Sequence, residues 1–169
     1  MSKDGRHPNS LLRNESSQSA GPRFVDVTFE AGLGEIHYPT QTAAWADYDN
    51  DGDVDLFVGN EFDPTINAPC QLFRNNGDGT FSDVARQAGV ATPAFVKAVV
   101  WGDVDEDRFP DLFVSVLGGA NRLYRNNRDG AFTDIAAVAG VEGPKQSFPS
   151  WFWDYDNDGH LDLYVSSYK

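Results

Sequence analysis

Cysteine, cationic residues and long apolar runs are all scarce in this sequence of 169 residues. Cys70 is the only cysteine, so the chain cannot form an intrachain disulfide, and we expect a small buried apolar side chain there. No stretch approaches the ~18 apolar residues that a membrane-spanning helix needs. The N-terminal segment MSKDGRHPNSLLRNESSQSAGP has no apolar core long enough for a secretory signal. We therefore expect residues 1–22 to form a polar, flexible leader.

The shortage of cationic residues leaves a strongly acidic chain. Lys and Arg number 13 against 26 Asp and Glu, which gives a formal net charge of -13. Phosphate groups repel such a chain, which argues against nucleic acid or an anionic membrane as a partner. Aromatic residues nevertheless make up 13% of the sequence, too many for an acidic disordered tail. Length and aromatic content together predict one folded domain with a sizeable core.

Many of the acidic residues belong to a motif that occurs three times. The three segments begin at Trp45, Trp101 and Phe152 and read WADYDNDGDVDLFVGN, WGDVDEDRFPDLFVSV and FWDYDNDGHLDLYVSS. Their first aspartates are 56 and then 51 residues apart. A nearly fixed period of this size is typical of a repeat architecture.

A second motif recurs in phase with the first. It reads LFRNNGDGTFSDVARQAGV from Leu72 and LYRNNRDGAFTDIAAVAGV from Leu123, and its last part occurs once more as FVDVTFEAGL from Phe24. The NNGDG and NNRDG segments predict hairpin turns, because Asn, Asp and Gly tolerate positive φ. The segments that follow predict one helical turn each, with Asp83 or Asp134 as N-cap and a glycine just past the end.

Each repeat unit is predicted to consist of four short strands. Strand one leads into the acidic loop, strand two leaves it, and strands three and four flank the hairpin turn. Four-stranded antiparallel units of about 50 residues are typical of β-propeller blades, and a parallel β-helix, with shorter repeats, is the minor alternative. The chain holds strand four of one unit, two whole units and strands one and two of another, eleven strands in all. We therefore predict an all-β fold with about two and three-quarter propeller blades over residues 23–169.

Such a chain cannot close into a ring by itself, because a propeller needs at least about four blades, or about sixteen strands. It also ends in LDLYVSSYK, an apolar strand whose free edge favours pairing with another chain. Three explanations stay open at this point. The chain is part of a longer protein that supplies the missing blades, it self-associates through the open edge, or it folds as an open stack.

The acidic loops span residues 47–55, 103–111 and 154–162, with carboxylates at positions 1, 3, 5 and 9. Carboxylates this close repel one another unless a cation lies among them. Alternate oxygens on a curled backbone converge on one point, and the carbonyl of position 7 can join them. An all-oxygen set with high coordination suits Ca2+, whereas Mg2+ requires tighter octahedral geometry and transition metals prefer His or Cys. The predicted carboxylate ligands are Asp47, Asp49, Asp51, Asp55, Asp103, Asp105, Asp107, Asp111, Asp154, Asp156, Asp158 and Asp162. The predicted carbonyl ligands at position 7 are Asp53, Phe109 and His160.

Position 6 of each loop requires a left-handed backbone, and Gly52 and Gly159 fit that requirement. The middle loop has Arg108 there, which costs conformational energy and adds a positive charge beside the site. We expect two or three Ca2+ ions, with the middle site weakest or empty. Three ions would bring the net charge from -13 to -7, so their removal is expected to loosen the strand pair beside each loop. The alternative, ordinary Asp/Gly turns without metal, is disfavoured by three such loops in phase.

The repeated aspartate motif, together with LFRNNGDGTF, resembles the FG-GAP or VCBS-type repeats of integrin α-like β-propellers. It resembles more closely the bacterial cartilage-acidic-protein-like propellers that often carry an ASPIC/UnbV domain after the propeller. The resemblance covers about residues 23–169 and implies calcium-binding blades with the matching aspartates as ligands. It also implies an extracellular, periplasmic or cell-surface location, where calcium is abundant. Arg108 departs from the family pattern.

The first functional hypothesis is a non-catalytic, calcium-stabilised scaffold that binds a protein or glycan in adhesion. Trp45, Trp101 and Phe152 share one offset before the loops, which favours core packing, whereas Trp151 and Trp153 break the repeat and favour a ligand surface. The alternative is a propeller-based lyase or hydrolase. No Ser/His/Asp, Cys/His or paired-His arrangement is visible, so we predict that the chain is not an enzyme. A third reading is a purely structural piece of a larger propeller.

Overall fold

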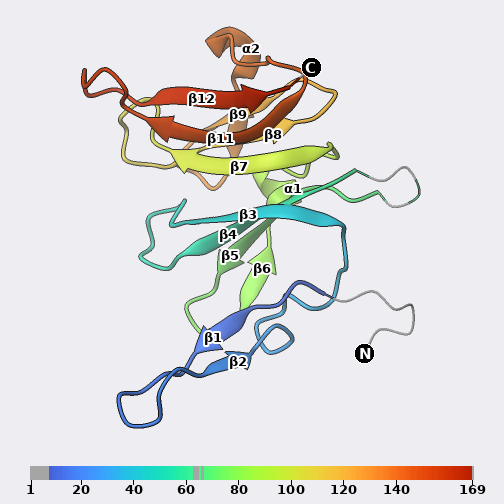
Figure 1. The fold of residues 1–169 in the computed structure, drawn as a ribbon, viewed down its shortest axis with the longest axis vertical. Coiled ribbons are helices and arrows are strands. Elements are labelled where there is room, and N and C mark those ends of the chain that lie inside the picture. Colours follow the sequence, from blue (N-terminus) through green and yellow to red (C-terminus); the bar gives the residue numbers. More distant parts are fainter. Residues whose placement is uncertain (1–7, 63–64, 66, 169) are drawn as a thin grey trace.

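The computed structural model describes residues 8–62, 65 and 67–168. Over these residues the regular structure is almost entirely β, as predicted (Figure 1). The strands are β1 (Leu12–Asn14), β2 (Phe24–Asp26), β3 (Thr40–Ala46), β4 (Asp55–Asn60), β5 (Gln71–Asn75), β6 (Phe81–Asp83), β7 (Val96–Gly102), β8 (Asp111–Val116), β9 (Arg122–Asn126), β10 (Phe132–Asp134), β11 (Ser147–Trp153) and β12 (Asp162–Ser167). The helices are α1 (Ala85–Ala88) and α2 (Ala136–Ala139).

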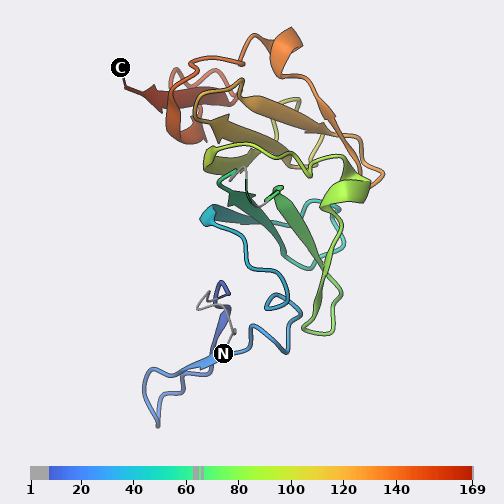
Figure 2. The ribbon, with the colours of Figure 1, turned by 90° about the vertical axis from the view of Figure 1, so that its right-hand side faces the viewer.

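Two of the sheets are complete four-stranded antiparallel blades. Strands β3, β4, β5 and β6 form blade 1 in chain order, and β7, β8, β9 and β10 form blade 2. Strands β11 and β12 pair as the first half of blade 3. The blades are stacked on one another, with β7 in contact with both β3 and β11 (Figures 1 and 2). Over the described residues the sheets do not close into a ring, so the prediction of incomplete propeller blades is confirmed.

The three acidic loops begin and end at equivalent points of their sheets. In each blade the residue before the loop pairs with the aspartate at position 9. The pairs are Ala46 with Asp55, Gly102 with Asp111 and Trp153 with Asp162. Side chains alternate between the two faces of a strand, so a shared register gives each loop position the same orientation in all three blades.

The helical turns end where they were predicted to end but begin one residue later. Gly89 and Gly140 adopt left-handed conformations with φ of 80° and 73°. The N-cap of α1 is Val84 and not Asp83, although Asp83 Oδ1 accepts a hydrogen bond from the Ala85 N–H at 3.0 Å. The start of α2 repeats this arrangement one blade later. Neither four-residue helix is long enough to cross a membrane, and the described part of the chain contains no other α-helix.

Aromatic side chains fill the space between consecutive blades. Trp101 of β7 lies edge-on to Phe57 of blade 1, with ring centroids 6.2 Å apart, and Phe152 of β11 lies edge-on to Phe113 of blade 2 at 6.5 Å. Phe57 and Phe113 are completely buried. Core packing is therefore confirmed for Trp101 and Phe152. Trp45 is 49% exposed, because its side of blade 1 faces no other blade among the described residues.

The N-terminal segment contains a strand, β1, that we did not predict, although LLRN from Leu11 repeats the LFRN and LYRN of strand three. Strand β1 pairs antiparallel with β2, and Leu12 lies opposite Asp26. Asp26 Oδ1 accepts hydrogen bonds from the N–H and hydroxyl of Thr28, whose Oγ1 in turn accepts the Leu11 N–H at 2.8 Å. All three residues of β1 are exposed, so no alternation of apolar and polar residues marks this strand. The boundary at residue 22 stays a prediction, and residues 1–7 lie outside the described part.

Candidate metal centres

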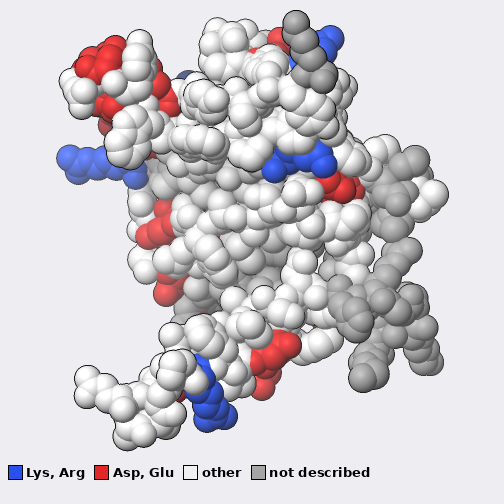
Figure 3. All heavy atoms as spheres, in the orientation of Figure 1, with Lys and Arg blue, Asp and Glu red and all other residues white. Residues whose placement is uncertain are grey.

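Each acidic loop folds back on itself so that three carboxylates meet. One oxygen from each of positions 1, 3 and 9 lies within 4.8 Å of the other two. The groups are Asp47, Asp49 and Asp55; Asp103, Asp105 and Asp111; and Asp154, Asp156 and Asp162. The loops lie on one side of the stacked blades, where Figure 3 shows acidic side chains gathered along the left-hand edge.

The aspartate at position 9 anchors the loop to the blade. Asp55 is completely buried, and its two oxygens accept the N–H of Tyr48 at 3.1 Å and the N–H of Asn75 at 2.8 Å. One carboxylate therefore joins the loop to the third strand of the blade. Asp111 makes the equivalent two bonds in blade 2. Burial raises the pKa of Asp55 to about 6 and raises the pKa of Asp111, although the N–H donors oppose the shift.

The aspartate at position 1 orders the turn itself. Asp47 Oδ1 accepts the Asp51 N–H at 3.1 Å, and Asp47 Oδ2 accepts the Gly52 N–H at 3.0 Å. The middle and third loops make the same two bonds. Position 6 is left-handed in all three loops, as predicted, with φ of 95° at Gly52, 72° at Arg108 and 94° at Gly159.

The aspartate at position 3 gives the first loop a feature that fits a bound cation. Asp49 Oδ1 is buried and has no hydrogen-bond partner among the described residues. Burial raises the pKa of Asp49, and the nearby charges of Asp51 and Asp47 act in the same direction. A buried carboxylate oxygen without a donor costs free energy. All the candidate ligand atoms around this point are oxygens, so the cluster of Asp47, Asp49 and Asp55 fits a hard cation such as Ca2+.

The aspartates at position 5 lie outside the groups of three. Asp51, Asp107 and Asp158 each use Oδ1 to accept the N–H of position 7, at 2.8 to 2.9 Å. The motif suggested that all four carboxylates converge equally, but these local bonds set position 5 apart from the others. The ligand roles of position 5 and of the carbonyls of position 7 stay predictions.

The middle loop contains an ion pair that the motif does not predict. Arg128, in the hairpin between β9 and β10, donates from Nε to Asp107 Oδ2 at 2.6 Å. Desolvation opposes ionisation of Asp107, but the Phe109 N–H and the Arg128 guanidinium outweigh it, so the pKa of Asp107 falls. The equivalent hairpin position in blade 1 is Gly77. The only signal in the sequence is NNRDG in place of NNGDG, and the middle loop therefore has Arg128 in addition to Arg108.

Neighbouring loops also touch each other. Asn50 of the first loop donates from Nδ2 to the carbonyl oxygen of Arg108 in the middle loop at 3.0 Å. Glu106 of the middle loop forms a hydrogen-bonded pair with His160 Nδ1 of the third loop. This contact raises the pKa of the exposed His160. The imidazole of His160 thus bonds a neighbouring loop, while its carbonyl stays the predicted ligand.

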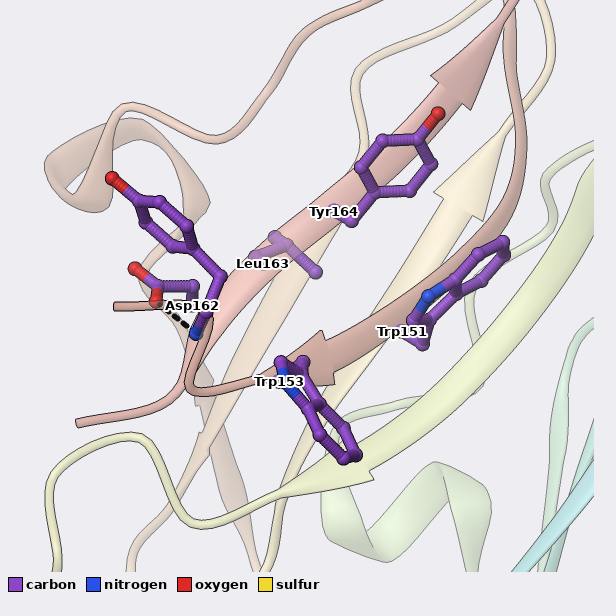
Figure 4. Close-up of a pocket in the computed structure, with 6 residues that line it drawn as sticks. Trp151, Trp153, Asp162, Leu163 and Tyr164 are labelled. Carbon is purple, nitrogen blue, oxygen red and sulfur yellow. Dashed lines mark hydrogen bonds between the residues drawn. The ribbon is translucent and has the colours of Figure 1, made fainter. Parts of the chain in front are cut away.

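The outer face of the half-blade carries a cluster of exposed aromatic residues (Figure 4). Trp151, Trp153 and Tyr164 are 50%, 70% and 57% exposed and line a hollow of about 440 Å³. Figure 4 shows the three side chains on the same side of β11 and β12. Gly102 is the residue of blade 2 that is equivalent to Trp153. A Cβ added to Gly102 would lie 2.6 Å from the Phe152 ring of the next blade, so no larger side chain fits there. The face of blade 3 therefore differs from the face that packs against a following blade.

His37 contacts a backbone group. Its Nε2 lies 3.0 Å from the carbonyl oxygen of Gly34. Within the part of the chain that the structure describes, its hydrogen-bond partner is thus not a carboxylate, and no acid–base pair is formed there.

Comparison with known families agrees with this architecture. A family model described as an FG-GAP-like repeat matches residues 47–114 and again residues 103–165. Each match begins at the first aspartate of a loop and ends in the strand that directly follows the next loop, β8 or β12. The chain belongs to the FG-GAP-like repeat family. The resemblance inferred from the aspartate motif is therefore confirmed.

Curated relatives include cartilage acidic protein 1 of three vertebrates. Identity over 170 aligned residues is 28% for Xenopus tropicalis and 29% for both Mus musculus and Homo sapiens. Each alignment covers 94% of this chain but only 24% to 25% of the relative. The FG-GAP chain thus spans about a quarter of the length of these relatives.

Proposed function

We propose that this FG-GAP module binds calcium in its acidic loops and serves as a calcium-stabilised scaffold. The observation that carries the proposal is the convergence of three carboxylates in every loop. In the first loop, one oxygen of Asp49 is also buried without a hydrogen-bond donor among the described residues. A bound Ca2+ ion supplies positive charge at that point and takes the carboxylate oxygens as ligands. Asp55 transmits the effect, because its carboxylate also holds the Tyr48 and Asn75 N–H groups of the surrounding blade.

The loops are proposed to differ in affinity. Arg128 already pairs with Asp107 in the middle loop, and Arg108 is a second cationic residue in the same loop. An internal cation competes with a metal ion for the same carboxylate charge. We therefore propose that two or three Ca2+ ions bind, with the middle site weakest.

The same loops support a location where calcium is abundant. Extracellular calcium modules bind in roughly the 10⁻⁴ to 10⁻³ M range. We propose an extracellular, periplasmic or cell-surface location, in agreement with the resemblance to cartilage-acidic-protein-like propellers.

A ligand role is supported by the aromatic face of the half-blade. Trp151 and Tyr164 lie with ring centroids 5.1 Å apart, and Trp153 extends the same surface. Flat apolar surfaces of this kind stack against sugar rings or against apolar side chains of a protein. We propose a non-catalytic adhesion scaffold whose protein or glycan ligand binds here, and not an enzyme, because no described histidine pairs with an acid outside the loops.

Calorimetry on the calcium-stripped chain tests the metal proposal. Ca2+ is expected to bind at two or three sites and to raise the melting temperature, and Mg2+ to do so far less. No binding, or an equal response to Mg2+, would mean that the loops are turns only. For the ligand role, the double variant Trp151→Ala, Trp153→Ala should lose glycan or protein binding while its calcium titration is unchanged.

A further inference from the structure

Asn126, the last residue of β9, contacts the candidate metal sites of two different blades. It is buried, and its Nδ2 donates to the carbonyl oxygen of Tyr48 in the first loop at 2.8 Å, although the two residues are 78 apart in sequence. The same Nδ2 donates to the carbonyl oxygen of Pro110 at 3.2 Å, and the Asn126 N–H donates to Asp111 Oδ1 at 2.8 Å. Pro110 and Asp111 are positions 8 and 9 of the middle loop. One buried side chain therefore bonds the first and the middle loop.

The side-chain amide of Asn126 has a fixed orientation. Its Oδ1 accepts the Arg128 N–H at 2.9 Å, so its Nδ2 faces the carbonyl groups of Tyr48 and Pro110. The two hydrogens of the amide nitrogen match these two acceptors. A buried carbonyl group that loses its donor costs free energy, so the bond from Asn126 holds the Tyr48 carbonyl in place.

Tyr48 lies within the converging carboxylates of the first loop. Asp47 precedes it, Asp49 follows it, and its N–H donates to Asp55 Oδ2 at 3.1 Å. The Tyr48 ring packs against Phe132 of blade 2, with ring centroids 5.7 Å apart. Blade 2 thus holds both the carbonyl and the ring of a residue that stands between two candidate ligands of blade 1.

The first and middle loops also touch at the surface. Asn50 follows Asp49, and its Nδ2 donates to the carbonyl oxygen of Arg108 at 3.0 Å. This contact is exposed, and water competes for the donor and the acceptor of an exposed hydrogen bond. The buried bond from Asn126 is therefore the stronger of the two links between these loops.

Asn75 is the residue of blade 1 that is equivalent to Asn126. Its N–H donates to Asp55 Oδ1, its Nδ2 donates to the carbonyl of Val54, and its Oδ1 accepts the Gly77 N–H. Asn126 makes the same three bonds within blade 2. Among the described residues, however, Asn75 makes no hydrogen bond to the loop of another blade. The bond to Tyr48 is thus what distinguishes Asn126 from its counterpart.

We propose that Asn126 couples the first and middle loops, so that Ca2+ binding in one raises the Ca2+ affinity of the other. This inference rests on the proposed calcium function. When the middle loop is filled, Asp111 is restrained, and with it Asn126 and the Tyr48 carbonyl. The first loop then loses less conformational entropy when it binds its own ion. Coupling of this kind is reciprocal, so each loop raises the affinity of the other by the same factor.

Calorimetry on the full chain with Asp156→Asn tests the coupling, because this substitution disables the third loop and leaves two sites. Adding Asp49→Asn leaves only the middle site, and adding Asp105→Asn leaves only the first. Salt at about 0.15 M limits repulsion between the two ions, because the Debye length is then about 8 Å. We expect each loop to bind Ca2+ about fivefold more tightly when the other is intact, equivalent to about 1 kcal/mol of coupling.

Two matched variants assign the coupling to Asn126. Asn126→Ala and Asn75→Ala each remove the side-chain donor to position 8 of their own loop, so both should weaken their own site. Only Asn126→Ala should abolish the coupling, and Asn75→Ala should keep it. Equal coupling in the two variants, or affinities that do not depend on the neighbouring loop, would overturn the proposal. Ca2+ binding at independent sites refutes the coupling alone, whereas absence of Ca2+ binding refutes the calcium function itself.

Amide hydrogen exchange tests the same link with Asn126 in place, which covers the case in which Asn126→Ala does not fold. In the chain with Asp49→Asn and Asp156→Asn, only the middle loop binds Ca2+. Saturating Ca2+ should slow exchange of the Tyr48 N–H about fivefold, although this amide belongs to the disabled first loop. Addition of Asp105→Asn should remove the effect. Exchange at Tyr48 that does not respond to Ca2+ would contradict the coupling.

Discussion

Replacement of Arg128 by glycine is the sharpest test of how the middle loop differs from the others. The substitution removes the guanidinium that lies 2.6 Å from Asp107. The backbone accepts the change, because φ is 65° at Arg128 and 74° at Gly77, the equivalent residue of blade 1. Glycine adopts this left-handed conformation without the penalty that arginine incurs.

The size of the effect follows from the exposure of the two partners. The Arg128 side chain is 56% exposed and the Asp107 side chain 8%, so solvent screens the pair only in part. An exposed ion pair is worth about 0 to 1 kcal/mol, and a value of about 1 kcal/mol suits one buried partner. Ca2+ would no longer compete with this pair, so its dissociation constant at the middle loop should fall roughly fivefold.

Calorimetric titration of Arg128→Gly beside the reciprocal variant Gly77→Arg measures this effect. In Gly77→Arg the new side chain starts 2.9 Å from Asp53 Oδ2, which is the end of a flexible side chain and can move. We expect the first variant to bind Ca2+ more tightly at one site and the second to bind more weakly at one site. If the calcium-free melting temperatures are unchanged and neither affinity moves, an internal cation does not tune these loops.

Three further predictions concern the packing of the blades. Cys70 is 2% exposed and burial raises its pKa from 9.0 to about 11, so alkylation at pH 8 should be at least about a hundredfold slower than in denaturant. Because the native state holds this proton, the contribution of Cys70 to stability is present below pH 9 and lost as the pH rises towards 11. Asp55→Ala should cost about 2 to 4 kcal/mol in urea unfolding, because it leaves two N–H groups without an acceptor. Asp162→Ala should cost distinctly less, because Asp162 accepts a bond only from the Tyr155 N–H among the described residues; equal costs would contradict the anchoring role. Trp101→Ala should cost about 3 to 5 kcal/mol, and the half-exposed Trp45→Ala should cost clearly less by the same measurement.

The parts of the fold that follow from short-range patterns could be predicted from the sequence. The period of the aspartate motif placed the strands beside the loops, and NNGDG and NNRDG marked the hairpins. Gly52 and Gly159 correctly indicated the left-handed turn, because that requirement is local to the loop. Strand β1 was not predicted, although LLRN from Leu11 repeats the LFRN and LYRN of strand three. Its pairing with β2 and the bond to the Thr28 hydroxyl are long-range contacts that only the folded chain reveals.

The candidate site was predictable in outline but not in its contacts. Alternate aspartates indicated a cation, yet the pattern treats positions 1, 3, 5 and 9 alike. Asp51 stands apart because its oxygen bonds the Asp53 N–H, a consequence of backbone curvature. The pair of Arg128 with Asp107 joins residues 21 apart in sequence, so only the folded hairpin reveals it. The exposure of Trp45 likewise depends on which blades are present and not on its position in the repeat.

The hydrogen bonds between loops arrange the three candidate sites in a row, with the middle loop between the first and the third. Asn50 of the first loop and His160 of the third loop both bond to the middle loop, and among the described residues no hydrogen bond joins the first loop to the third. Influence in such a row passes between nearest neighbours, as in a linear array of repeats. The middle loop, which has the lowest proposed affinity for metal, is therefore the link between the outer two. The rigidity of the middle loop therefore decides whether the first and third loops respond to calcium together or separately.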